Sequence, residues 1–158
     1  MGVHTGIGYD SHRLVAGRRL VLGGVELASE LGLAGHSDAD VLAHAVIDAV
    51  LGAAGLGDIG MHFPDADERW RDADSIELLR SAVGLVRDAG YAVTGVDATI
   101  VLETPKLGEA RQAIRERLAD ALGLAAGHVN VKATTGEGIG FVGRGEGVAA
   151  LAIATLDG

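Results

Sequence analysis

Gly-Val-Ala-Ala-Leu-Ala-Ile-Ala-Thr-Leu, residues 147–156, is the stretch that decides the fold. It carries no charged side chain and combines small apolar residues with β-branched ones, which is typical of a strand buried on both faces. Its apolar run from Val148 to Leu156 is too short to span a bilayer. We therefore expect a buried strand of a globular protein at this point of the chain.

A glycine-rich stretch leads directly into this strand, with six of the 25 glycines of the chain between Gly136 and Gly147. Residues 138–143 match the pattern Gly-x-Gly-x-x-Gly, but a dinucleotide-binding loop of that kind must lead into a helix of a β-α-β unit. Because a strand is expected next, we reject the match. The stretch is then either a plain turn or a loop in which the backbone, Glu137 and Arg144 suit phosphate oxygens and a divalent metal.

Strands and helices alternate in the rest of the chain. Apolar residues recur every three or four positions from Val41 to Val50, which predicts a helix capped by Ser37 and Asp38 that ends at residues 52–55. We also expect helices at residues 75–89 and 108–122, strands at residues 3–9, 91–103 and 129–134, a hairpin within residues 19–27, and a mobile loop at residues 57–74. This order predicts an α/β (α+β) protein, one domain over residues 1–158 with a single mixed β-sheet and helices packed on one face.

The composition excludes several classes of protein. Without any cysteine the chain cannot form disulfides or a thiolate zinc site, so a metal must be held by His and carboxylate ligands. A net charge of -9 and an aromatic content of 3% argue against a nucleic-acid surface, and the first residues lack the features of a signal peptide. We expect a cytoplasmic protein without nucleic-acid or membrane partners. The mean hydropathy of +0.29 suggests buried subunit contacts.

Two segments carry residues that suit a metal site. Asp10 and His12 lie two positions apart in an extended segment, so their side chains project from the same side. Asp40, His44 and Asp48 are spaced by four and share one helical face. The plain alternatives are a surface pair for the first segment and a solvated helix face for the second. If Asp10, His12 and His44 converge, however, they form the two-histidine, one-carboxylate set of a catalytic zinc site with an open fourth position.

Neighbouring residues add to this interpretation. Asp48 is expected to accept a hydrogen bond from the other ring nitrogen of His44 or from a neighbour. A helix that begins at Ser37 would offer free N–H groups to an anion. Residues 57–60 and 63–67 form a loop that could close over a ligand. Ordinary surface or packing positions are expected for the remaining histidines, His4, His62 and His128.

Taken together, these segments resemble the 2-C-methyl-D-erythritol 2,4-cyclodiphosphate synthase family. The motifs occur in the same order and at compatible spacings from about Gly6 to the last strand. They are Gly-Tyr-Asp-Ser-His (8–12), Leu-Gly-Gly-Val (22–25), Gly-His-Ser-Asp-Ala-Asp-Val (35–41), His44, Gly-Asp-Ile-Gly (57–60), Phe-Pro-Asp (63–65), Pro105-Lys106, Val-Asn-Val-Lys-Ala-Thr-Thr (129–135) and Gly-Phe-Val-Gly-Arg-Gly-Glu-Gly (140–147).

The resemblance implies a phosphorus–oxygen lyase of the non-mevalonate route to isoprenoid precursors. Such an enzyme converts 4-diphosphocytidyl-2-C-methyl-D-erythritol 2-phosphate into 2-C-methyl-D-erythritol 2,4-cyclodiphosphate and CMP. The family forms homotrimers around packed sheets, with active sites between adjacent subunits, and an isoprenoid diphosphate is a candidate ligand of the central cavity. The attacking group is already a phosphate oxyanion, so no general base is needed, and the sequence offers no Ser-His-Asp or Cys-His set.

The resemblance also implies roles for the matching residues. Asp10, His12 and His44 would bind Zn²⁺ with Asp48 behind them, and Glu137 would bind a second metal, Mg²⁺ or Mn²⁺. His36 and Thr135 would be the catalytic residues that stabilise the transition state. Substrate contacts are expected from Asp10, Ser11, His12, His36, Ser37, Asp58, Ile59, Gly60, Phe63, Pro64, Asp65, Ala66, Asp67, Phe141 and Arg144. Nucleotide contacts are expected from Leu102, Glu103, Thr104, Pro105, Lys106, Leu107, Gly108, Ala133, Thr134 and Thr135.

Three positions depart from the family pattern. Ala39 stands where Gly is frequent, Gly136 stands where a third hydroxyl residue is frequent, and Glu103-Thr104 before Pro105 is not typical. We expect the change at Gly136 to loosen the phosphate loop, while none of the three touches a metal ligand. Two alternatives stay open: a zinc-dependent phosphohydrolase with water in the fourth position, and a non-catalytic trimeric nucleotide or metal binder.

Overall fold

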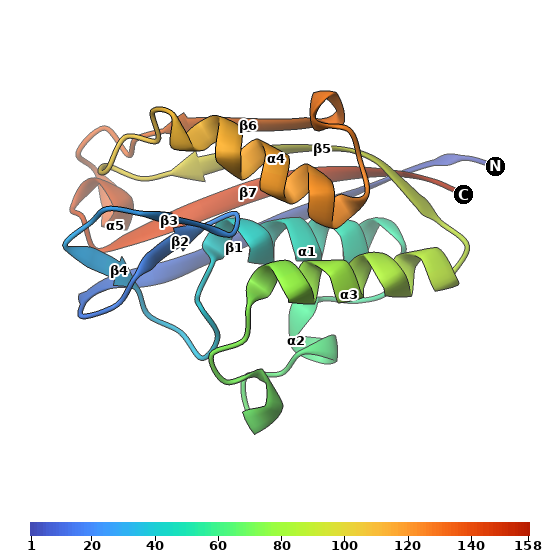
Figure 1. Cartoon of the computed structure of the whole chain (residues 1–158), viewed down its shortest axis with the longest axis horizontal. Coiled ribbons are helices and arrows are strands. Elements are labelled where there is room, and N and C mark those ends of the chain that lie inside the picture. Colours follow the sequence, from blue (N-terminus) through green and yellow to red (C-terminus); the bar gives the residue numbers. More distant parts are fainter.

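A five-stranded mixed sheet forms the centre of the molecule, which is described here over residues 1–158 by a computed structural model (Figure 1). The strand order is β4-β1-β7-β5-β6, and only β5 and β6 pair in parallel. The strands are β1 (Val3–Ala16), β4 (Leu31–Leu33), β5 (Ala92–Val101), β6 (Val129–Thr134) and β7 (Gly147–Asp157). A separate ribbon pairs β2 (Leu20–Leu22) with β3 (Val25–Leu27), so the expected hairpin is confirmed.

The helices cover one face of this sheet, as Figure 1 shows. They are α1 (Val41–Ala53), α2 (Ile59–His62), α3 (Ser75–Asp88), α4 (Ala110–Leu122) and α5 (Gly140–Gly143), with 3-10 turns η1 (Glu68–Trp70) and η2 (Ala126–His128). The long helix α1 packs on β1 and β7, α3 packs beside α1, and α4 contacts α3 and β6. None of these helices combines the length and the apolar composition that crossing a bilayer requires.

Two glycines of β1 let α1 lie directly against the strand. A Cβ atom at Gly8 would overlap the backbone carbonyl of Ala45, and one at Gly6 would overlap that of Ala49. Because the side-chain period of a strand is two, residues 10 and 12 continue on this same helix-facing side. The close approach therefore brings the first turns of α1 near the second half of β1.

The opposite face of the sheet carries no helix and exposes a row of large apolar side chains. Ile7 is 70% exposed and pairs with Ile153, while Tyr9 is 53% exposed and pairs with Leu151. The expected burial of the last strand on both faces is therefore wrong for Leu151 and Ile153 in the single chain, although residues 147–150 are buried. We call this surface of Ile7, Tyr9, Leu151 and Ile153 the open sheet face.

The start of α1 differs from the sequence prediction. The helix begins at Val41 and is capped by Asp40, not by Ser37 or Asp38. The Asp40 side chain is fully buried and accepts from the backbone N–H groups of Ala43 at 3.0 Å and of Gly23 and Gly24 in the β2-β3 turn. Periodicity could not reveal this cap, because two of its three hydrogen bonds go to a distant hairpin. It removes the free N–H groups that a start at Ser37 would have offered to an anion.

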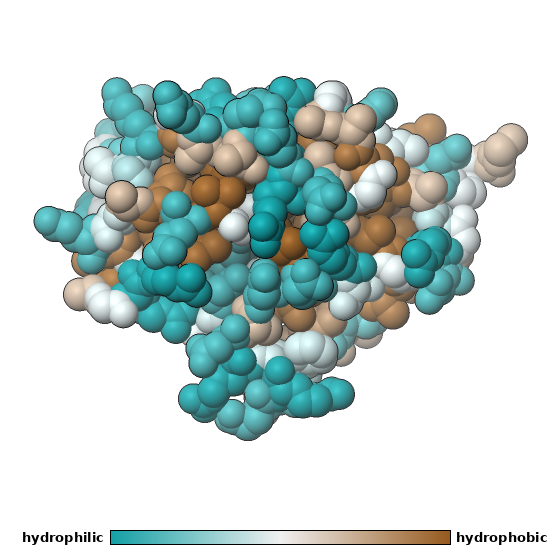
Figure 2. Space-filling view, viewed as in Figure 1, coloured by the Kyte–Doolittle hydropathy of each residue, from teal (hydrophilic) through white to brown (hydrophobic).

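Several short elements were absent from the sequence prediction. The first strand runs to Ala16 and pairs with β4, which the sequence did not indicate. The segment at residues 57–74, expected as a mobile loop, contains α2 and η1, each capped by an Asp side chain. It protrudes from the molecule in Figure 1 and is mostly hydrophilic in Figure 2. The glycine-rich stretch contains the four-residue α5 and then leads into β7, as expected.

Candidate functional site

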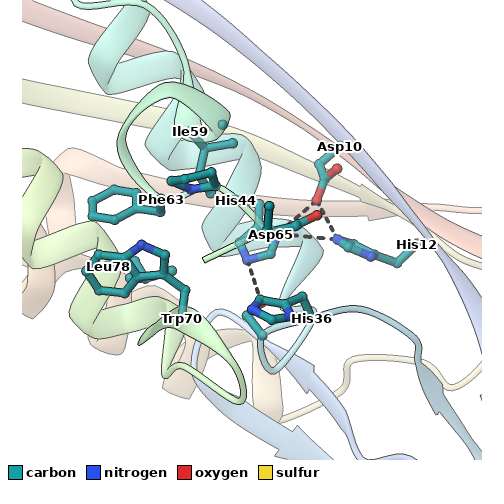
Figure 3. Close-up of a pocket in the computed structure, with 13 residues that line it drawn as sticks. Asp10, His12, His36, His44, Ile59, Phe63, Asp65, Trp70 and Leu78 are labelled. Atoms are coloured by element: carbon teal, nitrogen blue, oxygen red, sulfur yellow. Dashed lines mark hydrogen bonds and ion pairs between the residues drawn. The ribbon is translucent and has the colours of Figure 1, made fainter. Parts of the chain in front are cut away.

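Asp10, His12 and His44 converge at one point between β1 and α1, as the sequence suggested (Figure 3). The Oδ2 atom of Asp10 lies 2.8 Å from His12 Nε2 and 3.1 Å from His44 Nδ1. The two ring nitrogens lie 3.3 Å apart. All three ligand atoms lie within 4.8 Å of one another and could hold a metal ion.

The chemistry of these atoms fits a divalent cation. His12 Nδ1 lies 2.8 Å from the carbonyl oxygen of Ala34, which can only accept, so Nδ1 carries the proton of the neutral ring. His12 Nε2 then directs a lone pair toward Asp10 Oδ2 and His44 Nδ1. Electron-rich atoms pointed at one another repel unless a proton or a metal ion lies between them. Two imidazole nitrogens and one carboxylate oxygen are a donor set that zinc favours.

The electrostatics of the site keep Asp10 charged. Burial alone would raise the pKa of this carboxyl, but the hydrogen bonds and positive charges of His12 and His44 outweigh it and lower the pKa to about 2. Burial alone would lower the pKa of His12, but its hydrogen bond to the Asp10 carboxylate raises it above the ordinary value. Asp10 therefore offers a carboxylate oxygen across the whole neutral range.

A cavity of about 410 Å³ opens beside these three side chains. Its lining is Asp10, His12, His36, Ser37, His44, Ile59, Gly60, Phe63, Pro64, Asp65, Ala66, Trp70 and Leu78. Figure 3 shows the ligands on one side and Phe63, Trp70 and Leu78 on the other. The Phe63 and Trp70 rings meet edge to face, with centroids 5.2 Å apart. The cavity thus joins a polar, metal-suited end to an apolar end.

Other predicted substrate residues do not line this cavity. Ser11 lies between Asp10 and His12 in β1 and so faces the other side of the sheet. Asp58 and Asp67 cap short helical turns, where they accept from the N–H groups of Met61 and Arg69, each at 3.0 Å. The two caps shape the segment that carries Phe63 and Trp70. His36 donates from Nε2 to the Asp67 carbonyl at 3.1 Å and so ties this segment to the residues before α1.

Asp48 and Asp40 take structural roles instead of contacting the His44 ring. Asp48 Oδ1 accepts from the backbone N–H of Ile59 at 2.8 Å, so it holds the start of α2. Two partners were expected for Asp48, a neighbouring group and the His44 ring. The neighbouring group is found, and the His44 ring is not. The second nitrogen of His44, Nε2, lies 2.8 Å from Ser75 Oγ and 3.2 Å from Ser37 Oγ.

The predicted nucleotide residues form a second group, away from the cavity. They follow β5 and β6, whose ends lie side by side because Val101 pairs with Thr134 in the parallel register. None of residues 102–108, 133–137, 141 and 144 lines the cavity. Glu137 is exposed and adopts a φ of 54°, a conformation that a non-glycine residue rarely holds. Arg144 is exposed and forms an ion pair with Glu146 at 3.0 Å.

Gly136 packs more tightly than the sequence led us to expect. Its N–H donates to Glu103 Oε1, and a Cβ atom there would lie 2.7 Å from the backbone nitrogen of Gly143. Glycine at this position therefore lets the loop fold closely on itself, which disagrees with the expected loosening. At another of the three departures, Ala39 has a φ of 56°, which explains the preference for Gly there.

Sequence reasoning missed three cavity or ligand contacts. Trp70 and Leu78 line the cavity, and Ser75 contacts His44. Trp70 is the only tryptophan and lies in a segment without periodicity, and this combination could have indicated a cavity residue. Ser75 stands at the expected start of a helix, and nothing in its spacing from His44 indicates contact.

Comparisons with known proteins place this architecture in one family. The sequence model of the YgbB family matches residues 3–157. A 2-C-methyl-D-erythritol 2,4-cyclodiphosphate synthase of Salinibacter ruber is 61% identical over 154 residues, with 98% of each chain covered. A bifunctional enzyme IspD/IspF of Anaeromyxobacter sp. is 58% identical over 98% of this chain, which spans only 40% of the length of that relative.

Solved structures agree with this assignment. The bifunctional IspDF of Campylobacter jejuni superposes with a TM-score of 0.94 at 44% identity, covering 98% of this chain and 42% of that one. A 2C-methyl-D-erythritol-2,4-cyclodiphosphate synthase in a CDP-bound form gives a TM-score of 0.89 at 40% identity, covering 97% of this chain and 99% of that one. With a family match over nearly its whole length and with these relatives, the chain belongs to the YgbB family.

Proposed function

We propose that this chain is a 2-C-methyl-D-erythritol 2,4-cyclodiphosphate synthase, formed by residues 1–158 as a single domain in the cytoplasm. Its reaction closes 4-diphosphocytidyl-2-C-methyl-D-erythritol 2-phosphate into the cyclic diphosphate and releases CMP. The observation that carries this proposal is the convergence of Asp10, His12 and His44 at the polar end of a cavity. The name and full-length coverage of the Salinibacter relative support the same activity.

The cavity would hold the methylerythritol phosphate half of the substrate. A zinc ion on Asp10, His12 and His44 would neutralise and align the reacting phosphates and polarise the phosphorus under attack. His36 and Ser37 line the cavity and would offer hydrogen bonds to phosphate oxygens. The remaining substrate contacts proposed are Ser11, Asp58, Ile59, Gly60, Phe63, Pro64, Asp65, Ala66 and Asp67.

The second group of residues would hold the cytidine diphosphate half. We assign the nucleotide to residues 102–108 and 133–135, and a second divalent metal, Mg²⁺ or Mn²⁺, to Glu137. The adjacent ends of β5 and β6 give these loops one common edge. Related proteins solved in a CDP-bound form and as a CDP complex support a cytidine site in this fold.

We further propose that the protein works as a homotrimer with active sites between subunits. In a single chain the nucleotide loops do not line the cavity, and in the proposed assembly a second copy would bring them there. The open sheet face supports assembly, because Ile7, Tyr9 and Ile153 are each more than half exposed in the single chain. Phe141 and Arg144 would then lie near the trimer axis, where an isoprenoid diphosphate is a candidate ligand.

The chain needs to supply orientation and charge, not a base. The nucleophile is a phosphate oxygen that is already ionised, so no side chain has to remove a proton. His36 and the hydroxyl and N–H of Thr135 are the groups proposed to stabilise the charge that develops in the transition state. Holding both phosphates in a ring-closing pose makes the attack intramolecular and supplies further acceleration.

One incubation tests the proposed function. The protein is mixed with the cytidine-linked substrate and Mg²⁺, CMP is followed by chromatography, and the second product is identified by ³¹P NMR. We expect CMP and a cyclic diphosphate in equal amounts. CMP with a linear product would instead show a phosphohydrolase, and the absence of CMP would leave only a binding protein.

A further inference from the structure

Ser75 connects the metal-suited cluster to α3. It is the first residue of that helix and is completely buried. Its Oγ atom lies 2.8 Å from His44 Nε2 and donates a hydrogen bond to Asp38 Oδ1, while its backbone N–H donates to Asp38 Oδ2 at 2.9 Å. The three side chains form a continuous row from Asp38 through Ser75 to His44.

The number of protons available determines which group donates and which accepts in each of these hydrogen bonds. An ionised carboxylate only accepts hydrogen bonds, and a serine hydroxyl has a single proton to donate. Ser75 gives that proton to Asp38, so its Oγ can only accept at the His44 ring. The hydrogen therefore resides on His44 Nε2, and the neutral ring has its lone pair on Nδ1.

That lone pair points to the proposed metal position. His44 Nδ1 faces Asp10 Oδ2 at 3.1 Å and His12 Nε2 at 3.3 Å. His12 has the opposite arrangement, with its proton on Nδ1 and directed to the Ala34 carbonyl. In each histidine, one ring nitrogen donates to a protein acceptor, and the nitrogen that faces Asp10 is free to bind a metal.

We infer that Asp38 and Ser75 are positioning residues that hold His44 in the tautomer and orientation that bind the metal. This inference rests on the metal site proposed above and extends it to residues that touch neither metal nor substrate. Partners behind metal-bound histidines commonly set ring orientation and basicity, and their loss costs about 10- to 100-fold in metal affinity.

Ser37 cannot replace this row, although its Oγ lies 3.2 Å from the same His44 nitrogen. That oxygen already accepts from the Ala39 N–H at 3.1 Å, and no carboxylate takes its hydroxyl proton. Ser37 can therefore either accept from Nε2 or donate to it. Donation would move the ring proton to Nδ1 and block the ligand atom, so Asp38 and Ser75 are what select the correct form.

The first test uses the metal-free protein and does not depend on activity. Nitrogen-15 NMR of the histidine rings at mildly alkaline pH reports which nitrogen carries the proton. We expect Nε2–H for His44 and Nδ1–H for His12 in the wild-type protein. An Asp38→Asn variant keeps the size of the side chain but no longer forces the Ser75 proton away from the ring, so we expect an increased share of Nδ1–H in His44. A wild-type His44 in the Nδ1–H form would overturn the inference.

The second test measures the affinity for Zn²⁺ alone, by competition with a chelator. We expect Ser75→Ala to weaken zinc binding by about 10- to 100-fold and Asp38→Asn to weaken it in the same direction. The matched control is Ser81→Ala, the same substitution at an exposed position of α3, with unchanged affinity. Circular dichroism verifies folding, and Asp38→Asn decides the question if Ser75→Ala does not fold.

The outcomes distinguish a failure of the role given to Asp38 and Ser75 from a failure of the metal site itself. Equal zinc affinity in the wild-type protein and the three variants would overturn the role of Asp38 and Ser75 while leaving the metal site in place. A wild-type protein without zinc affinity would overturn the metal site itself, and with it the inferred role.

Discussion

The cavity and the nucleotide loops differ in how completely a single chain builds them. In the cavity, Asp10 and His44 are mostly buried, Asp10 Oδ2 lies 3.1 Å from His44 Nδ1, and Ser75 contacts the other nitrogen of the His44 ring. In the loops, Thr135 and Glu137 are exposed, and the Glu137 N–H donates to Thr135 Oγ1 at 3.1 Å. One half of the site is preorganised within the fold, whereas the other half is presented outward.

This difference indicates that the cavity of one chain lacks the loop residues proposed to act on the same substrate. Groups that stabilise a transition state have to reach the same substrate, and preorganised donors act only over hydrogen-bond distances. The loops of one chain do not line its own cavity. In the assembly proposed above, a second copy would bring its loops to the cavity, and the open sheet face would offer the apolar surface for that contact.

Mixed assemblies test most directly whether the cavity and the loops of one site come from two different chains. A His44→Ala variant lacks the cavity half and a Glu137→Ala variant lacks the loop half, so each alone should be nearly inactive. In a cyclic assembly mixed at random from equal amounts, about one quarter of the sites pair an intact cavity with an intact neighbouring loop. We expect that fraction of wild-type CMP formation after the two are unfolded and refolded together.

The control for this experiment mixes two variants of the same half, His44→Ala and Asp10→Asn. No site of that mixture has an intact cavity, so no activity should return. Absence of recovery in the first mixture as well would show that each site lies within one chain.

Loss of a proposed metal ligand gives the next largest effect. His44→Ala removes one of three donor atoms, so we expect zinc affinity to fall by more than about 100-fold, beyond the effect of losing an outer partner. His128→Ala is the matched control, because His128 is exposed and belongs to no donor set. Metal content after gel filtration checks both. Stoichiometric zinc in His44→Ala would show that the ligand assignment is wrong.

Sequence reasoning predicted the cavity half well where local rules apply. The two-residue spacing of Asp10 and His12 and the periodicity of α1 depend on the regular geometry of strands and helices. These rules predicted the convergence of Asp10, His12 and His44, the main elements and the helix-covered sheet. The extent of β1 and the existence of β4 depend on pairing between distant segments, which periodicity does not reveal.

The contacts behind the ligands could not be predicted for the same reason. Asp40 is spaced like a site residue, yet its carboxylate is used by the hairpin at Gly23 and Gly24. Ser75 is spaced like an ordinary cap, yet α3 delivers its hydroxyl to His44. Each outcome is decided by which distant backbone or side chain arrives at the same place, so only the tertiary structure distinguishes a ligand partner from a cap.

A methyl group at Gly136 tests whether the loops can be disturbed without any effect on the cavity. The Cβ atom of Gly136→Ala would meet the backbone nitrogen of Gly143 at 2.7 Å, so the loop has to open. Displacement of positioning groups by less than 1 Å suggests a KM increase of about 10-fold. Zinc affinity should not change, because none of Asp10, His12 and His44 belongs to this loop. A parallel loss of zinc would contradict the separation of the two halves.

The smallest expected effect concerns the metal-free cavity and its response to pH. His12 has a pKa raised by its contact with Asp10, so the stability it contributes is complete below its ordinary value of 6.5 and is lost as pH rises through the raised pKa. Asp10, with a pKa of about 2, stays ionised throughout and adds no slope. The melting temperature of the metal-free protein should therefore fall with rising pH across the neutral range.

Zinc should reverse this slope, because the ion replaces the proton between His12 and Asp10 and binds more tightly as that proton leaves. The two forms are compared by calorimetry over the same pH series, with His12→Gln as the control that has no titrating ring at this position. Parallel slopes in the metal-free and zinc-loaded wild-type protein would mean that the proton and the metal do not compete for one place. The close contact of His12 with Asp10 would then be an ordinary ion pair.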